Sequence, residues 1–186
     1  MDAKRLLRSR LLAARAARPA ADLAAAAVSL AEHGAAEWGH LPRLAAYAGV
    51  GGEPPTRALL DRLLSAGCTV VLPVVTETEL RWAPYNGWDV LVAGSMGLLQ
   101  PAGPTSGSDA LASAEVLLVP ALAVDVHGNR LGRGKGYYDR ALAEVAPERA
   151  VAVVYDDEVL DEVPVEAHDR PVGAVLTPSG LRVLGS

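Results

Sequence analysis

The stretch that decides the predicted fold runs Val116-Leu-Leu-Val-Pro-Ala-Leu-Ala-Val-Asp125 and continues, after two residues, as Gly128-Asn-Arg-Leu-Gly-Arg-Gly-Lys-Gly-Tyr-Tyr-Asp-Arg140. Its first four residues form an apolar run that predicts a buried strand, and residues 137–145 predict a helix. The glycine-rich segment between them predicts a loop. Because open α/β sheets bind ligands at the carboxyl ends of their strands, we expect this loop to carry a ligand site.

The same alternation of helix and strand extends to both sides of this stretch. Helices are predicted for residues 4–17, 22–33 and 57–66, with Gly34 ending the second helix and Thr56 able to cap the third. Strands are predicted for residues 44–48, 68–75, 80–84 (at a sheet edge), 150–154 and 173–176, and a mostly irregular loop for residues 87–108. We therefore expect an α/β fold: one three-layer α/β/α domain over residues 1–186 with a mostly parallel central sheet.

The composition narrows the class of protein. Of the 186 residues, 51% are hydrophobic, and no uninterrupted apolar run approaches the ~18 residues of a membrane-spanning helix. Cys68 is the single cysteine, so an internal disulfide is excluded and a reducing compartment is indicated. We therefore expect a cytoplasmic protein that has no membrane partner and acts as a monomer.

The charge is distributed unevenly along the chain, whose formal net charge is −5. Residues 1–18 contain six basic residues and one acid, so the remainder is strongly acidic. An acidic body repels a long polyanion, and no nucleic-acid partner is expected. An Arg-rich start is also typical of a mitochondrial transit peptide, and composition alone leaves that alternative open.

The loop at residues 128–140 has the composition of a phosphate site. Its glycines permit tight turns in which backbone N–H groups converge on an anion, and Arg130, Arg133 and Lys135 add positive charge. The start of the following helix adds a positive dipole end. The loop is not a Walker A motif, because no Ser or Thr follows Lys135. These features favour a nucleoside triphosphate, and the competing interpretation is a flexible surface loop with solvated bases.

The quoted residues resemble the signature of the 5-formyltetrahydrofolate cyclo-ligase family, also called methenyltetrahydrofolate synthetases. Three shorter segments are similar to further motifs of the family in the expected order, so the resemblance covers nearly the whole chain: Lys4-Arg-Leu-Leu-Arg8, Gly52-Glu-Pro-Pro-Thr56 and Val163-Pro-Val-Glu-Ala-His-Asp169. The resemblance implies ATP- and Mg²⁺-dependent conversion of a small-molecule folate, 5-formyltetrahydrofolate, to 5,10-methenyltetrahydrofolate. The resemblance implies release of ADP and phosphate. Because a formamide is a poor electrophile, we further expect its formyl oxygen to be phosphorylated during the reaction.

The resemblance also implies roles for individual residues. Arg133 and Lys135 are the implied catalytic charge stabilisers of phosphoryl transfer. ATP contacts are implied for Lys4, Arg8, Arg130, Leu131, Gly132, Arg133, Gly134, Lys135, Gly136, Tyr137 and Tyr138. Folate contacts are implied for Arg8, Glu53, Arg133, Gly134, Lys135, Gly136 and Tyr137. Asp139 and Asp169 are the implied Mg²⁺ ligands, and two carboxylates plus phosphate oxygens suit that ion.

Several of these residues have simpler interpretations. Glu53 could be an ordinary acidic residue of a loop. Asp139 could equally be an acid in the first turn of a helix, and Asp169 could form an ion pair with Arg170. A solvated helix face is expected for Arg5, Arg10, Arg15 and Arg18, and Val74 and Ala48 depart from the family pattern on its folate side. Two other functions stay open: a nucleotide-binding module without catalysis and a small-molecule kinase.

Overall fold

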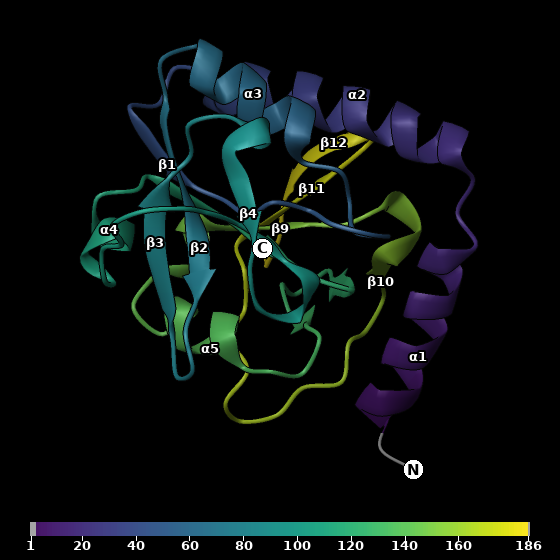
Figure 1. Ribbon diagram of the computed structural model, residues 1–186. Coiled ribbons are helices and arrows are strands. Elements are labelled where there is room, and N and C mark those ends of the chain that lie inside the picture. The colour runs from purple at the N-terminus through teal and green to yellow at the C-terminus, as the bar shows by residue number, and fades with distance from the viewer. Residues whose placement is uncertain (1–2, 186) are drawn as a thin grey trace.

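A seven-stranded sheet organises the molecule (Figure 1). The computed structural model describes residues 3–185, and for residue 96 its backbone only. In spatial order the strands are β12 (Gly180–Val183), β11 (Ala174–Thr177), β9 (Ala150–Val153), β6 (Val116–Pro120), β1 (Arg43–Ala45), β2 (Thr69–Val75) and β3 (Leu80–Pro84). The five inner strands are parallel, and both edge strands are antiparallel to their neighbours. The predicted mostly parallel sheet is confirmed.

The direction in which the chain builds this sheet reverses between β1 and β6. From β1 the chain proceeds outward to β2, and from β6 it proceeds the other way, to β9 and then β11. Leu44 pairs with Val116 and Ala45 with Leu117, so the two strands end at the same edge of the sheet. Open α/β sheets form a ligand crevice at such a reversal. The glycine-rich stretch follows β6 and therefore lies next to this point.

Helices cover both faces of the sheet, as the three-layer prediction requires. One face carries α2 (Ala20–Trp38) and α3 (Arg57–Ser65), which lie together at the top of Figure 1, and the other carries α4 (Asp109–Ala112) and α5 (Tyr137–Leu142). Because side chains alternate along a strand, β6 supplies both layers. Its Leu118 enters the core under α2 and α3, and its Leu117 and Val119 enter the core under α4 and α5.

The first helix, α1 (Ala3–Ala16), stands apart from these layers at the side of the molecule (Figure 1). Its Leu11 packs with Leu122 and Leu131 beside a small sheet made of β10 (Val159–Leu160), β7 (Ala123–Asp125) and β8 (Arg130–Leu131). The carboxylate of Asp125 is fully buried and accepts hydrogen bonds from the backbone N–H groups of His127, Asn129 and Val163. Asp125 therefore fixes the β7–β8 turn.

This hairpin corrects the prediction of one continuous loop. Residues 130 and 131 pair with β7, so the irregular residues divide into the hairpin turn at 126–129 and the segment 132–136 before α5. Residues 87–108 are also more regular than predicted, with two 3₁₀ turns, η1 (Trp88–Val90) and η2 (Ser95–Gly97), and a ribbon of β4 (Leu91–Ala93) and β5 (Leu99–Pro101). The remaining 3₁₀ turns are η3 (Pro147–Arg149) and η4 (Asp156–Glu158), and β12 was not predicted.

Two predicted helix signals are wrong for identifiable reasons. Gly34 does not end α2, because it serves close packing: a Cβ built there would lie 2.6 Å from a methyl group of Leu59 on α3. Thr56 does not cap α3 with its side chain. Its hydroxyl instead donates to the carbonyl of Tyr47 (2.9 Å) and accepts from the N–H of Gly49 (2.8 Å). Among the described residues, no helix is both long enough and apolar enough to cross a membrane.

Candidate active site at the carboxyl ends of the strands

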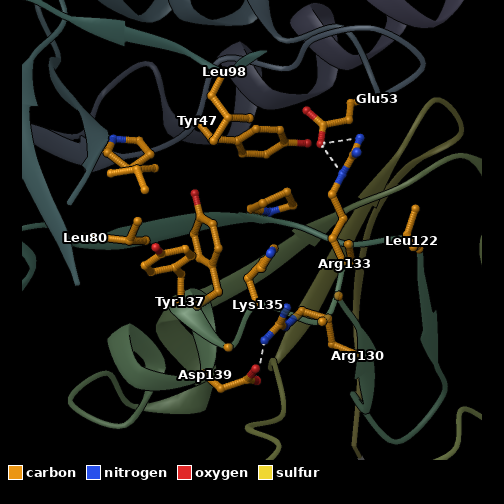
Figure 2. Close-up of a pocket in the computed structure, with 18 of the residues that line it drawn as sticks. Tyr47, Glu53, Leu80, Leu98, Leu122, Arg130, Arg133, Lys135, Tyr137 and Asp139 are labelled. Atoms are coloured by element: carbon orange, nitrogen blue, oxygen red, sulfur yellow. Dashed lines mark hydrogen bonds and ion pairs between the residues drawn. The ribbon is translucent and has the colours of Figure 1, made fainter. Parts of the chain in front are cut away.

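A cavity of about 500 Å³ opens at the carboxyl ends of β1 and β6. Its walls come from α1, the segments that follow β1 and β6, strand β2, the β4–β5 ribbon and the start of α5. Leucine side chains line much of it, among them Leu80, Leu98 and Leu122 (Figure 2). A cavity of this size, largely apolar and with few polar groups, suits a ligand of several fused or linked rings. We call it the apolar cavity.

Glu53 supplies a buried carboxylate to this cavity. It lies in the turn after β1 and is only 5% exposed. Its Oε2 accepts a hydrogen bond from the N–H of Val50 (3.1 Å), and its carbonyl accepts one from the hydroxyl of Tyr155 (3.1 Å). The Thr56 hydroxyl fixes the other end of the turn through its hydrogen bonds to the backbone of Tyr47 and Gly49. The sequence Gly-Glu-Pro-Pro-Thr thus builds a rigid support for one acid.

Arg133 reaches this carboxylate from the other side of the cavity. Its Nε and Nη2 lie 3.1 and 3.0 Å from Oε1 of Glu53. The arginine side chain is half-exposed, whereas the carboxylate is buried. Two nitrogens on one oxygen leave the remaining guanidinium N–H groups free to point elsewhere in the site. The sequence did not predict this contact, although the family resemblance implied a folate contact for each of the two residues.

The segment 132–136 separates the apolar cavity from a second one. Gly134 and Gly136 adopt left-handed backbone conformations (φ 90° and 69°), which a side chain would strain. Arg8 of α1 packs over this segment and donates from Nε to the carbonyl of Gly132 (2.9 Å). A Cβ at Gly134 would lie 3.4 Å from the Arg8 guanidinium carbon. The helix that follows has six residues, so its dipole contributes less than the sequence interpretation assumed.

The second cavity, of about 650 Å³, is predominantly charged, and we call it the charged cavity. Its cationic side chains are Lys4, Arg8, Arg130, Lys135, Arg140 and Arg170, and its acids are Asp139, Glu166 and Asp169. Six residues line both cavities in addition to Asp139: Arg8, Arg130, Gly132, Gly134, Lys135 and Gly136. A dense group of cations around glycine backbone is an arrangement that binds polyphosphate.

Arg130 and the partly buried Asp139 form an ion pair (Figure 2), and both residues line both cavities. Nη2 of Arg130 lies 2.6 Å from Oδ1 of Asp139. Burial lowers the pKa of the Arg130 guanidinium, and the carboxylate opposes that effect. The pair crosses from β8 to α5 and so fixes both ends of the segment 132–136.

Lys4 and Asp169 form a second ion pair in the charged cavity, with Nζ 2.6 Å from Oδ2. Glu166 adds a second acid 3.2 Å from the same Nζ. Burial alone would lower the pKa of Lys4, but the hydrogen bonds and charges of both acids outweigh it and raise that pKa. Desolvation likewise opposes ionisation of Asp169, but the hydrogen bonds from Lys4 and from the N–H of Glu166, together with the charge of Lys4, outweigh it and lower the pKa of its carboxyl. Asp169 is therefore held as a carboxylate.

The sequence model of the 5-formyltetrahydrofolate cyclo-ligase family matches residues 1–178. The chain belongs to this family. The 5-formyltetrahydrofolate cyclo-ligase of Mycolicibacterium smegmatis is 47% identical over 140 residues, which cover 72% of each chain. The enzyme of the same name from Escherichia coli is 32% identical over 141 residues, covering 73% of this chain and 78% of that one.

Solved structures agree with this family membership. The solution structure of Aquifex aeolicus 5,10-methenyltetrahydrofolate synthetase has a TM-score of 0.78 at 28% identity, covering 98% of this chain and 93% of that chain. The synthetase from Mycoplasma pneumoniae has a TM-score of 0.72 at 18% identity and supports the fold alone. The chain is accordingly an enzyme of the cyclo-ligase family, and its α/β fold is the family's fold.

Within this cyclo-ligase fold, the residues expected to contact folate all line the apolar cavity. The residues expected to contact ATP divide between the two cavities. Lys4 and Leu131 line only the charged cavity, whereas Arg133, Tyr137 and Tyr138 line only the apolar one. The Tyr137 hydroxyl donates to the carbonyl of Thr76 (3.1 Å), so this ring is also anchored to the β2–β3 turn.

The two acids expected to bind Mg²⁺ both line the charged cavity, and each already accepts a hydrogen bond from a cation. Among the described residues, the group of side chains close enough to share one metal ion is Glu166, His168 and Asp169, whose ligand atoms lie within 4.8 Å of one another. Asp139 is not part of that group. The sequence interpretation did not name Glu166 as a candidate ligand, although it lies in the same segment as Asp169.

Arg15 corrects the prediction of a solvated helix face. It is 4% exposed, its Nε and Nη2 each lie 2.7 Å from an oxygen of the buried Glu158, and Nη2 also donates to the carbonyl of Ala121 (2.6 Å). A signal was present in the sequence: Lys4, Arg8, Leu11 and Arg15 share one helical stripe. Arg18 likewise lies over the Tyr155 ring, 3.8 Å from its centre, rather than free in solvent.

The departures from the cyclo-ligase pattern on the folate side have structural counterparts. Pro73 and Val75 line the apolar cavity, and Val74 between them does not, as the alternation of a strand requires. A basic residue at position 74 would therefore point away from the cavity. Ala48 does line it, next to the bulkier Tyr47, and Leu98 and Leu99 close it from the β4–β5 ribbon.

Proposed function

We propose that this enzyme converts 5-formyltetrahydrofolate to 5,10-methenyltetrahydrofolate at the expense of ATP, which becomes ADP and phosphate. The observation that carries the proposal is the segment 132–136, which is at once a wall of the apolar cavity and a wall of the charged cavity. A folate in the first cavity and a triphosphate in the second would meet across this glycine-rich wall. Positioning two reactants at one boundary is the main task in phosphoryl transfer.

In this proposal Glu53 binds the pterin end of the folate. A buried carboxylate can accept two parallel hydrogen bonds from the N–H groups of an amino-pyrimidinone. The leucine-lined remainder of the apolar cavity suits the aromatic linker of the folate. Arg8, Arg133, Gly134, Lys135, Gly136 and Tyr137 complete the proposed folate contacts.

On the nucleotide side, the cations of the charged cavity hold the phosphates. Lys4 and Arg8 stand at i and i+4 on α1, so both can reach one anion. Arg130, Lys135 and the backbone at Leu131, Gly132, Gly134 and Gly136 are the proposed contacts from the opposite wall, and Arg133, Tyr137 and Tyr138 approach from the apolar side. Arg133 and Lys135 are the proposed catalytic residues, because they stand where charge moves from ATP to the folate.

The charged cavity also offers oxygen donors to a Mg²⁺ ion: Asp169, which lies in one group with Glu166 and His168, and Asp139, which lies outside that group. Asp139 and Asp169 are hard oxygen donors in the charged cavity, and the lowered pKa of Asp169 keeps it ionised. When bound, Mg²⁺ supplies neutralisation of the phosphate oxygens. The ion would compete with Lys4 and Arg130 for these carboxylates, which frees both cations for phosphate.

The proposed chemistry requires no nucleophile from the protein. A formamide is a poor electrophile, since its nitrogen donates into the carbonyl and its oxygen is a poor leaving group. Transfer of the γ-phosphoryl group to the formyl oxygen gives an iminium phosphate. N10 of the same folate then attacks the formyl carbon and gives up its proton to solvent, and inorganic phosphate departs with the former formyl oxygen. Arg8, Arg133 and Lys135 stabilise the charge that moves.

The remaining expectations extend this proposal. Strands from residue 43 to residue 183 share one sheet, which supports a single domain over residues 1–186. We propose that this domain acts as a monomer in the cytoplasm, binds no nucleic acid and needs no membrane.

The test is a direct assay of the purified protein. Mixing it with ATP, Mg²⁺ and 5-formyltetrahydrofolate should raise the near-ultraviolet absorbance of methenyltetrahydrofolate and release one ADP per product. Omitting ATP or Mg²⁺ should abolish both signals. A phosphorylated folate that accumulates without ring closure would instead identify a kinase. ATP binding without turnover, together with salt-sensitive binding of a polynucleotide, would favour a non-catalytic module.

A further inference from the structure

The hydroxyl of Tyr47 is buried in the wall of the apolar cavity without a hydrogen-bond partner among the described residues. The residue as a whole is only 4% exposed. Figure 2 shows its ring entering the cavity with the hydroxyl on the side of the Glu53 carboxylate. A buried hydroxyl that finds no partner destabilises a protein, so such a group generally indicates a ligand or an ordered water that satisfies it.

Backbone hydrogen bonds of the turn after β1 fix the position of Tyr47. Tyr47 lies two residues after the end of β1, and its carbonyl accepts the hydrogen bond that the Thr56 hydroxyl donates. The Thr56 hydroxyl also accepts a hydrogen bond from the N–H of Gly49. Tyr47 and Glu53 therefore belong to one hydrogen-bonded turn. Their phenol and carboxylate line the same cavity.

The phenol remains a donor throughout the working range of pH. Burial raises the pKa of Tyr47 well above its usual value, and the charge of Glu53 raises it further. The carboxylate next to it only accepts hydrogen bonds. The turn after β1 thus offers one donor beside one double acceptor.

We infer that the Tyr47 hydroxyl donates a hydrogen bond to the ring carbonyl of the folate while Glu53 accepts from the two adjacent N–H groups. This inference rests on the proposed function. An amino-pyrimidinone edge presents one carbonyl, one ring N–H and one exocyclic amine in a row. One phenol and one carboxylate, side by side, complement that row. Tyr47 is then a specificity residue for the heterocycle and takes no part in phosphoryl transfer.

The test compares Tyr47→Phe, which removes only the hydroxyl, with Tyr85→Phe. Tyr85 is as deeply buried, lines neither cavity, and donates to Asp61 (2.5 Å). Dissociation constants for 5-formyltetrahydrofolate are measured by calorimetry without ATP, and melting temperatures are measured without ligand. p-Aminobenzoylglutamate, the folate fragment that lacks the heterocycle, serves as a second ligand.

For Tyr47→Phe we expect the dissociation constant of 5-formyltetrahydrofolate to rise about tenfold. The affinity for p-aminobenzoylglutamate and the KM for ATP should not change, and the melting temperature should stay equal or rise, because no protein hydrogen bond is lost. Tyr85→Phe should show the opposite: a lower melting temperature and unchanged folate affinity.

The inference is overturned if Tyr47→Phe binds 5-formyltetrahydrofolate within twofold of the wild type, or if it weakens p-aminobenzoylglutamate equally. The proposed function is judged separately, on the wild-type protein alone. A wild type that binds folate but forms no methenyl product would contradict that proposal, while the ratio of the two dissociation constants would still decide the role of Tyr47.

Discussion

Arg133 and Glu53 are 80 residues apart in the sequence, yet the guanidinium places two nitrogens 3.0 and 3.1 Å from a single carboxylate oxygen. The pair joins the turn after β1 to the segment before α5, and so joins the proposed folate half of the site to the proposed phosphate half. A pterin that takes the Glu53 carboxylate must displace Arg133. The displaced guanidinium then stands beside the segment 132–136, where the phosphoryl group is proposed to cross.

The first prediction concerns Arg133. Arg133→Ala should lower kcat about a hundredfold, because a charge that stabilises the transferring phosphoryl group is lost. Arg133→Lys should restore only part of the rate, since an ammonium cannot bind in a fork. Arg81→Ala is the matched control: Arg81 is an arginine on β3 that lines neither cavity and binds Thr105. A rate loss in the control equal to that of Arg133→Ala would contradict the assignment.

Lys135 should behave differently from Arg133. Its side chain is exposed and lines both cavities, so Lys135→Ala should leave the melting temperature unchanged while kcat falls about a hundredfold. Lys135→Arg should recover more activity than Arg133→Lys does, because a point charge at this position needs no fixed orientation. Steady-state rates and thermal melts on the same preparations decide this. If Lys135→Ala keeps the kcat of the wild type, Lys135 is not a catalytic residue.

Glu53 should govern folate affinity and not nucleotide affinity. Glu53→Gln keeps the shape but replaces a charged acceptor, so the KM for 5-formyltetrahydrofolate should rise about tenfold or more. The KM for ATP should stay within twofold. Glu79→Gln, in the exposed β2–β3 turn, is the control for a general loss of negative charge. If only the KM for ATP rises, the assignment of Glu53 to the folate is wrong.

The two proposed Mg²⁺ ligands predict a shifted metal dependence. Asp139→Asn and Asp169→Asn should each raise the Mg²⁺ concentration needed for half-maximal rate about tenfold or more, because a neutral amide is a weaker ligand. Asp157→Asn removes an exposed carboxylate outside both cavities and should have no such effect. If the Mg²⁺ titration of Asp169→Asn coincides with that of the wild type, the Lys4–Asp169 pair is structural only.

The Arg15–Glu158 pair predicts a loss of stability rather than of chemistry. Both side chains are only 3% exposed, so Arg15→Ala should leave an uncompensated buried carboxylate and lower the free energy of unfolding by about 3–5 kcal/mol. The double change Arg15→Met with Glu158→Leu should recover most of that loss, because it removes both charges. Urea denaturation of the wild type and the two variants measures the difference. Equal stabilities for wild type and Arg15→Ala would contradict the buried-pair account.

The larger helices and strands could be predicted from the sequence, because each depends on a local pattern of apolar and polar residues. The run 116–119 is apolar on both faces and is a central strand flanked by two parallel neighbours. Local signals were misleading where packing overrides propensity. Gly34 reads as a helix end, yet it is kept small by Leu59 of another helix. The two-residue strand β8 has no periodicity of its own and exists because Asp125 fixes the turn before it.

The candidate site was predictable only in part. The glycine-rich segment carries its chemistry in consecutive residues, so its composition and the family resemblance both identify it. Contacts between distant segments left no local pattern. The approach of Arg133 to Glu53 depends on the strand reversal between β1 and β6, and the unpartnered hydroxyl of Tyr47 depends on how one turn is clamped. Arg15 was misjudged because a basic helix face is solvated in most proteins.

The central claim is that the formyl oxygen of the folate accepts the γ-phosphoryl group at the segment 132–136. The most direct test is to supply 5-formyltetrahydrofolate labelled with ¹⁸O in the formyl group, together with ATP and Mg²⁺, and to analyse the released inorganic phosphate by mass spectrometry. The account predicts that each phosphate carries one ¹⁸O atom, in step with the methenyl product. Methenyl product formed together with unlabelled phosphate would contradict it.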